Sequence, residues 1–394
     1  MSGRDVGLFA FARGISNFGG NGAHVALLVV LAAEGGSYIG FYMGAVAFVS
    51  VTFAPLNGYL ADKASAKHVL VTSDLLCAGC FLAAALSQGA TIWIITFGVL
   101  SALFEGPSNT AGIAAIGRQD DERVSQVLGT VESARNVGNV IGPAASAVLV
   151  SSFGASFAFA ANSLTFLVSA CAISLIHGFP AAESGNHQSR FGGFAEVLGN
   201  TALRRLVVAW IIVAAVASLL VVSDPFRAEE ISSTEDFSGL LGVVLSARAL
   251  GALSGSALVA SRSSARGGVL TVVGIAIMCA ALAGMGMLEN SVTIVMCSFM
   301  FGFGDSFAFV GRVTLTSRLV DRSVLGKAQA GFDACIGVVL TIAPPAAALM
   351  VSDLGPAGAQ IISSAILLSA ALLVLFGVLR HASRKTSALR SSTP

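Results

Sequence analysis

The sequence predicts an all-α integral membrane protein with twelve transmembrane helices arranged in two six-helix bundles. Of its 394 residues, 55% are hydrophobic and only 11% are charged, whereas a soluble domain carries about 25% charged residues. Continuous apolar runs recur along the chain, each close to the roughly 20 residues that cross a bilayer as a helix. These runs lack the apolar and polar alternation that barrel strands require, so we expect helices.

The expected spans follow one another with short connections. The first six are expected at 6–33, 37–60, 68–88, 91–116, 124–151 and 154–177. The second six are expected at 204–226, 237–260, 268–289, 292–317, 326–351 and 356–379. The longest polar segment divides the chain into an N-terminal bundle, a cytoplasmic linker, a C-terminal bundle and a cytoplasmic tail, at 1–177, 178–203, 204–379 and 380–394.

The basic residues predict the topology. Apart from Arg13, Arg135, Arg227, Arg248 and Arg312, all of the 22 Lys and Arg residues fall at or beside loops on one side of the expected spans. Loops rich in Lys and Arg stay in the cytoplasm. Both termini are therefore expected to be cytoplasmic, in a multi-pass protein of the cell's inner (plasma) membrane.

A shift of 200 residues superposes several features of the two halves. Glu105 returns as Asp305, Val69 and Leu70 return as Val269 and Leu270, and Arg118 and Asp121 return as Arg318 and Asp321. Such matches on equivalent helices indicate a duplicated unit, which is a common plan among secondary transporters.

Several functional classes are not expected. The six Cys residues lie inside expected spans, where "CAGC" (Cys77–Cys80) is best explained as buried small thiols. The chain has no phosphate-binding P-loop and no His and Cys cluster of metal-ligand spacing. We therefore expect neither an enzyme nor a protein that binds a metal, a cofactor or nucleic acid.

The charged turn "GYLADKASAKHVL" interrupts the apolar sequence between the second and third spans. Its Gly58, Asp62, Lys63 and Lys67 resemble the signature of the major facilitator superfamily. That resemblance implies two six-helix bundles with alternating access and gives these four residues a gating role. Gly58 allows close helix approach, and Asp62 can face a helix N-terminus and basic partners near Arg118 or Lys327.

A second motif, "GNVIGPAAS", contains Gly138, Gly142 and Pro143. It resembles the glycine-proline motif of the family's antiporters, and with Ala134 the two glycines form a smooth stripe suited to close helix packing. The segments "RGISNFGGNGAHVAL" and "FGASFAFAANSLTFL" are similar to bacterial drug and siderophore exporters.

Ionisable groups inside spans are costly and are therefore functional candidates. Helical spacing places polar residues in three stripes that we expect to face a wet central cavity between the two halves. The stripes consist of Arg13, Asn17, Gly20 and His24; of Glu105, Ser108, Asn109 and Gly112; and of Glu132, Arg135, Asn136 and Asn139. The expected cavity and substrate residues are Arg13, Asn17, His24, Asn109, Arg135, Asn136, Asn139 and Arg312.

Three acids are candidates for proton coupling: Glu105, Asp305 and Glu132. Glu105 has no cation within its own helix, and burial away from water favours the protonated form of a carboxylic acid. The alternatives for Glu105 are a hydrogen-bonded structural acid or a substrate contact. Glu132 and Arg135 have the spacing of a local ion pair.

The other ionisable residues have more ordinary interpretations. Arg312 is expected to keep Asp305 charged, and Asp333 is expected to pair with Lys327 or Arg322. A lone His such as His24 either shuttles protons or packs with a hydrogen bond.

These features together predict a proton-coupled secondary transporter that exports an amphipathic small molecule, such as a drug, a siderophore or a metabolite. Its partners are the substrate, protons and the lipid bilayer, and we expect a monomer. Two alternatives remain open at this point: an importer or facilitator of a polar nutrient, and a transport-inactive membrane sensor.

Overall fold

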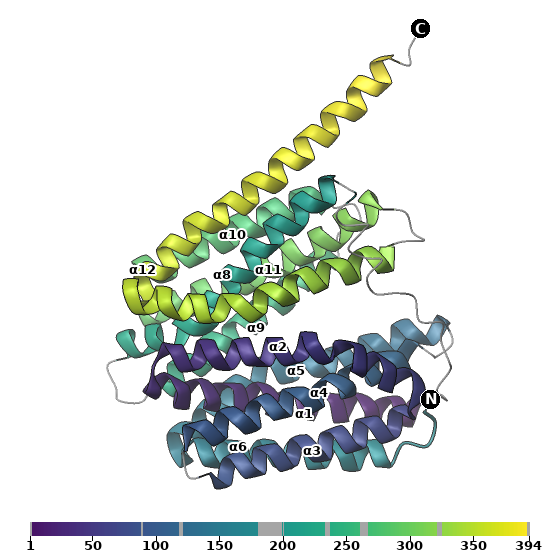
Figure 1. The fold of residues 1–394 in the computed structure, drawn as a ribbon, viewed down its shortest axis with the longest axis vertical. Coiled ribbons are helices and arrows are strands. Elements are labelled where there is room, and N and C mark those ends of the chain that lie inside the picture. Colours follow the sequence, from purple (N-terminus) through teal and green to yellow (C-terminus); the bar gives the residue numbers. More distant parts are fainter. Residues whose placement is uncertain are drawn as a thin grey trace. The chain divides into compact units, whose positions relative to one another are not determined.

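The computed structural model describes residues 2–87, 90–117, 121–179, 199, 201–232, 237–260, 267–320 and 325–391. Every regular element in this part of the chain is an α-helix (Figure 1), which confirms the all-helical class. The chain forms two compact units. Unit 1 comprises Met1–His187 with Asp224–Ser246, and unit 2 comprises Gln188–Ser223 with Ala247–Pro394.

Unit 1 contains the first six helices. They are α1 (Gly3–Glu34), α2 (Gly36–Lys63), α3 (Ala66–Leu86), α4 (Thr91–Gly117), α5 (Asp121–Phe153) and α6 (Ala155–Ser174). Helix α1 begins with a capping box, because the Ser2 Oγ accepts a hydrogen bond from the Asp5 N–H and the Asp5 carboxylate accepts one from the Ser2 N–H.

The remaining helices belong wholly or in part to unit 2. They are α8 (Thr201–Ile231), α9 (Ser238–Ala260), α10 (Gly267–Met287), α11 (Ser291–Leu319) and α12 (Leu325–Ser391). Helix α8 from Asp224 onward and α9 as far as Ser246 belong to unit 1. The predicted domain boundaries stay a prediction, and most of the predicted linker lies outside the described residues.

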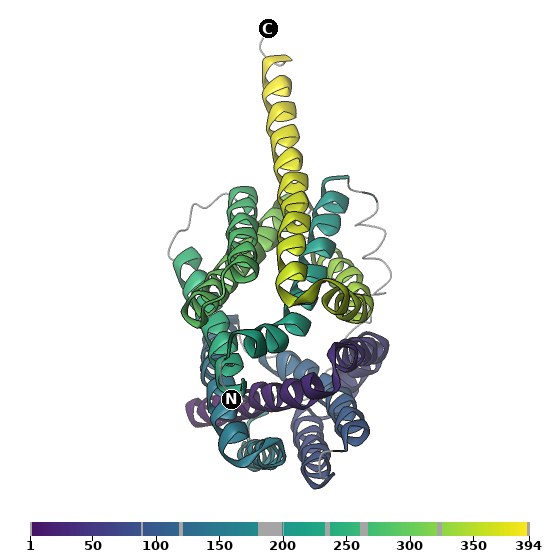
Figure 2. The ribbon, with the colours of Figure 1, turned by 90° about the vertical axis from the view of Figure 1, so that its left-hand side faces the viewer.

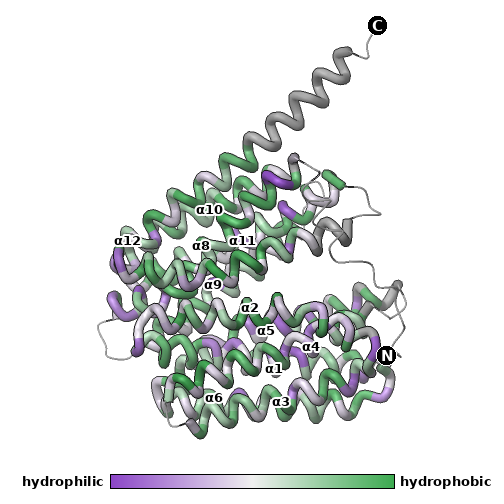
Figure 3. Tube along the Cα trace, viewed as in Figure 1, coloured by the Kyte–Doolittle hydropathy of each residue, from purple (hydrophilic) through white to green (hydrophobic). Residues whose placement is uncertain are grey.

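Ten helices in the described part of the chain are long and apolar enough to cross a membrane. Figure 3 shows hydrophobic residues distributed along these helices. Helix α5 is not one of the ten, and the 45-residue apolar segment Gly331–Leu375 counts once. This segment is about 68 Å long as a helix, more than twice the thickness of a bilayer core. The count of twelve spans therefore stays a prediction.

Single glycines turn one helix into the next at three places. Gly35, Gly154 and Gly355 have φ angles of 117°, 82° and 71°, a region that favours glycine because it has no Cβ. Gly355 lies inside α12 and separates two helical stretches, which run in different directions in Figures 1 and 2. The expected boundary between the last two spans, at 351–356, lies at this glycine.

Corresponding helices make corresponding contacts inside the two units. In unit 1, α3 packs against α4 and α6, and in unit 2, α10 packs against α11 and α12. A buried cluster in unit 1 includes Phe9, Leu70 and Ile173. Its counterpart in unit 2 includes Trp210, Met278 and Phe332. Each unit therefore has its own hydrophobic core.

Candidate functional site

A cavity of about 380 Å³ lies inside unit 1. Its lining combines charged and amide side chains with aromatic rings, contributed by all six helices α1–α6. The polar and ionisable lining residues include Arg13, Asn17, Asn21, His24, Tyr42, Asp74, Glu105, Ser108, Asn109 and Arg135. Several of the predicted polar positions therefore meet at one cavity.

Arg13 of α1 is held against α4. Its guanidinium donates a hydrogen bond of 2.9 Å to the Ser108 hydroxyl and one of 2.6 Å to the Asn109 Oδ1. Ser108 and Asn109 lie three and four residues after Glu105, on the same face of α4. Arg13 therefore contacts the helix that carries Glu105, although no direct ion pair joins these two described side chains.

Asp74 of α3 is almost completely buried, with 1% of its surface exposed. Its Oδ2 accepts a hydrogen bond of 2.6 Å from the Ser169 hydroxyl of α6. Its Oδ1 lies 3.5 Å from the Ser108 hydroxyl, which donates to it. Asp74 is therefore linked to Arg13 through one intervening hydroxyl.

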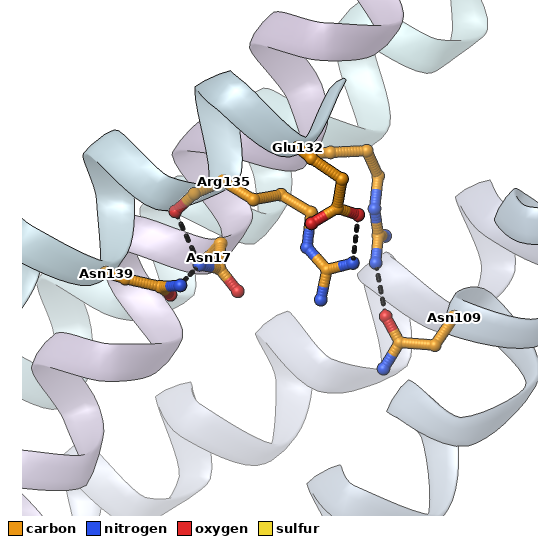
Figure 4. A network of polar contacts seen from close by, with 6 residues as sticks. Asn17, Asn109, Glu132, Arg135 and Asn139 are labelled. Atoms are coloured by element: carbon orange, nitrogen blue, oxygen red, sulfur yellow. Dashed lines mark hydrogen bonds and ion pairs between the residues drawn. The ribbon is translucent and has the colours of Figure 1, made fainter. Parts of the chain in front are cut away.

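Three asparagines connect α1 and α5 beside the cavity. The Asn17 amide donates hydrogen bonds to the Asn139 Oδ1 and, at 2.9 Å, to the Arg135 carbonyl oxygen (Figure 4). Asn21 donates to the same Asn139 Oδ1 at 2.9 Å. Asn139 thus contacts α1 through these hydrogen bonds and is not among the cavity-lining residues described.

Glu132 and Arg135 form the local ion pair that their spacing suggested. The Arg135 Nη1 lies 3.0 Å from the Glu132 Oε1 (Figure 4). Arg135 lines the cavity, whereas Glu132 and Asn136 are not among the lining residues described. Glu132 is therefore neutralised by a neighbour on its own helix.

Glu105 lies on the cavity wall with no hydrogen-bond or ion-pair partner among the described residues. Arg13 and Asp74 are the charged groups whose fields act on it. His24 also lines the cavity. Glu105 is thus a carboxyl group in contact with the cavity rather than part of a closed hydrogen-bond network.

The predicted gating segment lies at the end of α2 and the start of α3. The Lys67 Nζ donates hydrogen bonds of 2.7 Å and 2.8 Å to the carbonyl oxygens of Ser174 and Ile176. Lys67 therefore caps the C-terminal end of α6, where cations are favourable. Lys63 is exposed; the side chains of Asp62 and Lys327, and all of Arg118, lie outside the described part.

The small-residue stripe of α5 faces α1. A Cβ added at Gly138 would lie 2.7 Å from the Phe18 nitrogen and 2.8 Å from the Gly14 carbonyl oxygen. A Cβ at Gly142 would lie 2.6 Å from the Phe18 carbonyl oxygen. One turn before Gly138, the Ala134 Cβ lies 3.1 Å from the position that a Cβ added at Gly14 would take. Backbone atoms of α1 thus occupy the space that side chains would need.

The charged residues of unit 2 have partners different from those expected. Arg312 pairs with Asp333 at 3.6 Å and lies over the rings of Phe332, Phe309 and Trp210 at 4.4, 5.0 and 5.4 Å. Arg312 is therefore paired with Asp333 and not with Asp305, whereas the expected pairing of Asp333 with Lys327 or Arg322 involves side chains outside the described residues and stays a prediction. Arg248 is the cation that acts on Asp305.

Sequence reasoning missed part of the lining. Asn21, Tyr42, Phe81 and Phe166 all reach the cavity. Asn21 is four residues after Asn17, so the helical period could have found it. Nothing in the sequence distinguishes Phe81 and Phe166 from the other phenylalanines, because Phe is frequent throughout this chain. Tyr42 has no charged or amide residue three or four positions away that would have placed it at a cavity.

Membrane-length helices packed in two units, with a polar cavity inside one of them, define a polytopic membrane transporter. A model of the Major Facilitator Superfamily matches residues 9–223, which is more than half of the 394 residues. The chain belongs to the Major Facilitator Superfamily. A search of curated protein sequences found no match.

Solved structures of several transporters share the fold. The nucleoside transporter NupG is 13% identical, with a TM-score of 0.77 over 94% of this chain and 99% of that chain. A POT family transporter in complex with a thioalcohol conjugated peptide is 10% identical, with a TM-score of 0.78 over 96% of each chain. A bacterial homolog of the human lysosomal transporter Spinster, in an inward-facing and occupied conformation, is 11% identical, with a TM-score of 0.75 over 95% of this chain and 96% of that chain.

Proposed function

We propose that this transporter exports an amphipathic cation in exchange for protons, with Glu105 as the proton site. The observation that carries the proposal is the position of Glu105 on the cavity wall, without a hydrogen-bond or ion-pair partner among the described residues. The transporter works as a monomer by alternating access in the inner membrane. Both termini lie in the cytoplasm, as the distribution of Lys and Arg favours.

The charges of the cavity support exchange of a cation for a proton. Arg135 is neutralised by Glu132, which leaves Arg13 with the carboxyl groups of Asp74 and Glu105. When both acids are ionised, the cavity has one negative charge in excess, and protonation of Glu105 removes it. A proton and a cationic substrate therefore compete for the same site, and such competition couples their opposite movements.

The apolar part of the lining supports an amphipathic substrate. Phe81, Phe166 and the ring of Tyr42 contact the cavity together with Leu27 and Val46. Aromatic rings bind flat apolar groups and also attract cations over their faces. This cavity therefore offers a lipophilic cation both an apolar lining for its hydrophobic groups and a negative charge for its cationic group.

The export direction is supported by the α5 motif. Gly138, Gly142 and Pro143 resemble the motif of the family's antiporters, and the two glycines pack closely against α1. Antiport with protons entering the cell drives the other substrate outward.

Uptake of a polar solute is the second candidate. The amides of Asn17, Asn21 and Asn109 contribute hydrogen-bonding groups to the cavity wall, and the similar folds include a nucleoside transporter and a transporter bound to a peptide conjugate. A substrate bound mainly through these amides would have no need of the excess negative charge. A transport-inactive sensor remains the third possibility.

The test uses inverted, respiring membrane vesicles with a pH-sensitive dye and tetraphenylphosphonium, ethidium and a siderophore as added compounds. In the wild type, an accepted compound should release protons from the vesicles. Glu105→Gln should abolish this release, because the amide has no acidic proton to exchange, and should weaken counterflow of the cation without a pH gradient, because the excess negative charge is removed. Glu34→Gln, which changes an exposed acid that is not among the cavity-lining residues, is the matched control and should retain both activities.

The outcomes separate the candidates. Proton release that survives in Glu105→Gln would transfer the proton site to another acid. Accumulation of a polar solute in right-side-out vesicles, with no response to the cations, would favour uptake. Counterflow of the cation at the wild-type rate in Glu105→Gln would show that the cation and the proton do not compete at Glu105.

A further inference from the structure

The arrangement of Arg13 between two acids raises a question that the proposed function leaves open. Arg13 and Glu105 both line the cavity, and an Arg is the natural ion-pair partner of a buried Glu. A direct pair would hold Glu105 in its ionised form and prevent it from carrying a proton. Some other contact must therefore keep Arg13 in its present place.

Asp74 supplies that contact. The Ser108 hydroxyl accepts a hydrogen bond from the Arg13 Nη1 at 2.9 Å and donates its own proton toward the Asp74 Oδ1 at 3.5 Å. The hydroxyl thus transmits the charge of Asp74 to the guanidinium. Asn109 fixes the other nitrogen of Arg13 at 2.6 Å, so the guanidinium is held from two sides.

Asp74 is itself fixed from the opposite side. Ser169 of α6 donates a hydrogen bond of 2.6 Å to the Asp74 Oδ2, and both side chains are buried. No basic side chain pairs directly with Asp74 among the described residues. Burying a carboxylate without a direct ion pair costs free energy. The group in the cavity on which the charge of Asp74 acts is Arg13.

We infer that Asp74 is a positioning residue that holds Arg13 away from Glu105 through the Ser108 hydroxyl, and so leaves Glu105 free to exchange a proton. This inference rests on the proposed role of Glu105. It assigns Asp74 no contact with the substrate. Without the negative charge of Asp74, Arg13 turns to Glu105 and pairs with it.

Two measurements on the full-length protein test the inference. The first is labelling of Glu105 by dicyclohexylcarbodiimide in membranes, located by mass spectrometry. This reagent takes the proton of a neutral carboxylic acid on nitrogen while the carboxyl oxygen bonds to its central carbon, so labelling reports the protonated fraction. Asp74→Asn should reduce labelling of Glu105 at least about tenfold, as expected when a carboxyl group gains an Arg partner.

The second measurement is proton release on addition of tetraphenylphosphonium, compared with counterflow of the same cation. Asp74→Asn should lose proton release, whereas Asp74→Asn with Arg13→Gln should regain it to the level of Arg13→Gln alone. A purely structural role of Asp74 would not be rescued by removing Arg13. Ser108→Ala, which breaks the link but keeps both charges, should reduce labelling in the same direction.

Three results would overturn the inference. They are normal labelling of Glu105 in Asp74→Asn, failure of Arg13→Gln to restore labelling in that variant, and absence of labelling in the wild type. Failure of the proposed function is recognised separately. In that case the wild type shows no proton release with any compound, while the labelling of Glu105 still responds to Asp74 and Arg13.

Discussion

Lys67 illustrates how the structure adds to a motif at the scale of a single residue. The resemblance to the family signature gives Lys67 a gating role, and that role stays a prediction. In the structure, its ammonium group donates to two carbonyl oxygens at the end of α6. These carbonyls have no partner within the helix, so a cation at this place stabilises the helix end.

Removing this cap should destabilise unit 1. Lys67→Met should lower stability by about 1.5–3 kcal/mol, the usual range for hydrogen bonds to a charged group. Lys67→Arg should retain most of the stability, because it keeps the charge and the donors. Thermal unfolding in detergent, followed by tryptophan fluorescence or by a thiol dye, measures the difference.

The matched control is Lys63→Met, which removes an exposed Lys four residues earlier in the same segment. It should leave the unfolding temperature nearly unchanged. Equal effects of the two substitutions would show that the bonds of Lys67 to α6 contribute nothing measurable.

At the scale of the element, α5 shows how a sequence can serve packing and polarity on different faces. Glu132 and Arg135 provide charged groups, whereas Gly138, Gly142 and Asn139 contact α1. This mixed composition explains why α5 falls outside the helices that qualify as membrane spans by apolar composition. A helix that packs on protein and borders a cavity need not be apolar all round.

The close contact of α5 with α1 gives a clear prediction. Gly138→Ala places a methyl group against backbone atoms of Phe18 and Gly14, at 2.7 and 2.8 Å, and backbone cannot move aside as a flexible side chain can. We expect a loss of about 1–3 kcal/mol, as for other overpacked interfaces. Thermal stability and transport rate should both fall.

Gly129→Ala is the control on the same helix. Nothing lies within 4 Å of a Cβ at Gly129, so alanine there should be neutral or stabilise by about 0.5–1 kcal/mol through its better helix propensity. If Gly138→Ala were as stable as Gly129→Ala, α1 and α5 would not approach each other as closely as the structure describes.

At the scale of the whole molecule, the two units repeat the same internal plan. Gly154 and Gly355 turn one helix into the next with positive φ, and they lie about one repeat of 200 residues apart. The third helix of each half packs against equivalent neighbours, as α3 and α10 show. The duplicated unit suggested by the sequence matches is therefore consistent with the equivalent helix contacts of the two halves.

The predicted gate, formed by Gly58, Asp62, Lys63 and Lys67, would act through the change of conformation of the whole transporter. We predict that Asp62→Asn slows turnover about tenfold, which corresponds to about 1.4 kcal/mol in the limiting step, while substrate affinity stays nearly unchanged. The reason is that Asp62 is expected to stabilise one conformation through charged contacts, not to touch the substrate. Steady-state transport and equilibrium binding of tetraphenylphosphonium measure the two quantities.

Asp62→Glu serves as the comparison, since it retains the negative charge and should keep more of the rate. A normal rate in Asp62→Asn would remove Asp62 from the gate. A parallel loss of rate and affinity would assign it to the binding site or to folding.

The sequence by itself determined the membrane class, the helical character and the approximate bounds of most helices, although α12 continues to Ser391, beyond the expected end at 379. Apolar length and polar turns depend on neighbours along the chain, so they are visible without a structure. The polar faces of α1 and α4 were predicted in the same way. Arg13 and Asn17 of α1 are four residues apart, as are Glu105 and Asn109 of α4, and this spacing places each pair on one helix face. The family signature at Gly58 added the expected fold.

The tertiary structure decided which side chains meet across helices. Only packing brings Asp74 of α3, Ser108 of α4 and Arg13 of α1 together, and only packing gives Arg312 an ion pair with Asp333. Spacing along one helix sorts residues onto faces but says nothing of which face another helix presents. Electrostatic partners depend on distances of a few ångströms between segments far apart in sequence, and those distances are set by the packed fold.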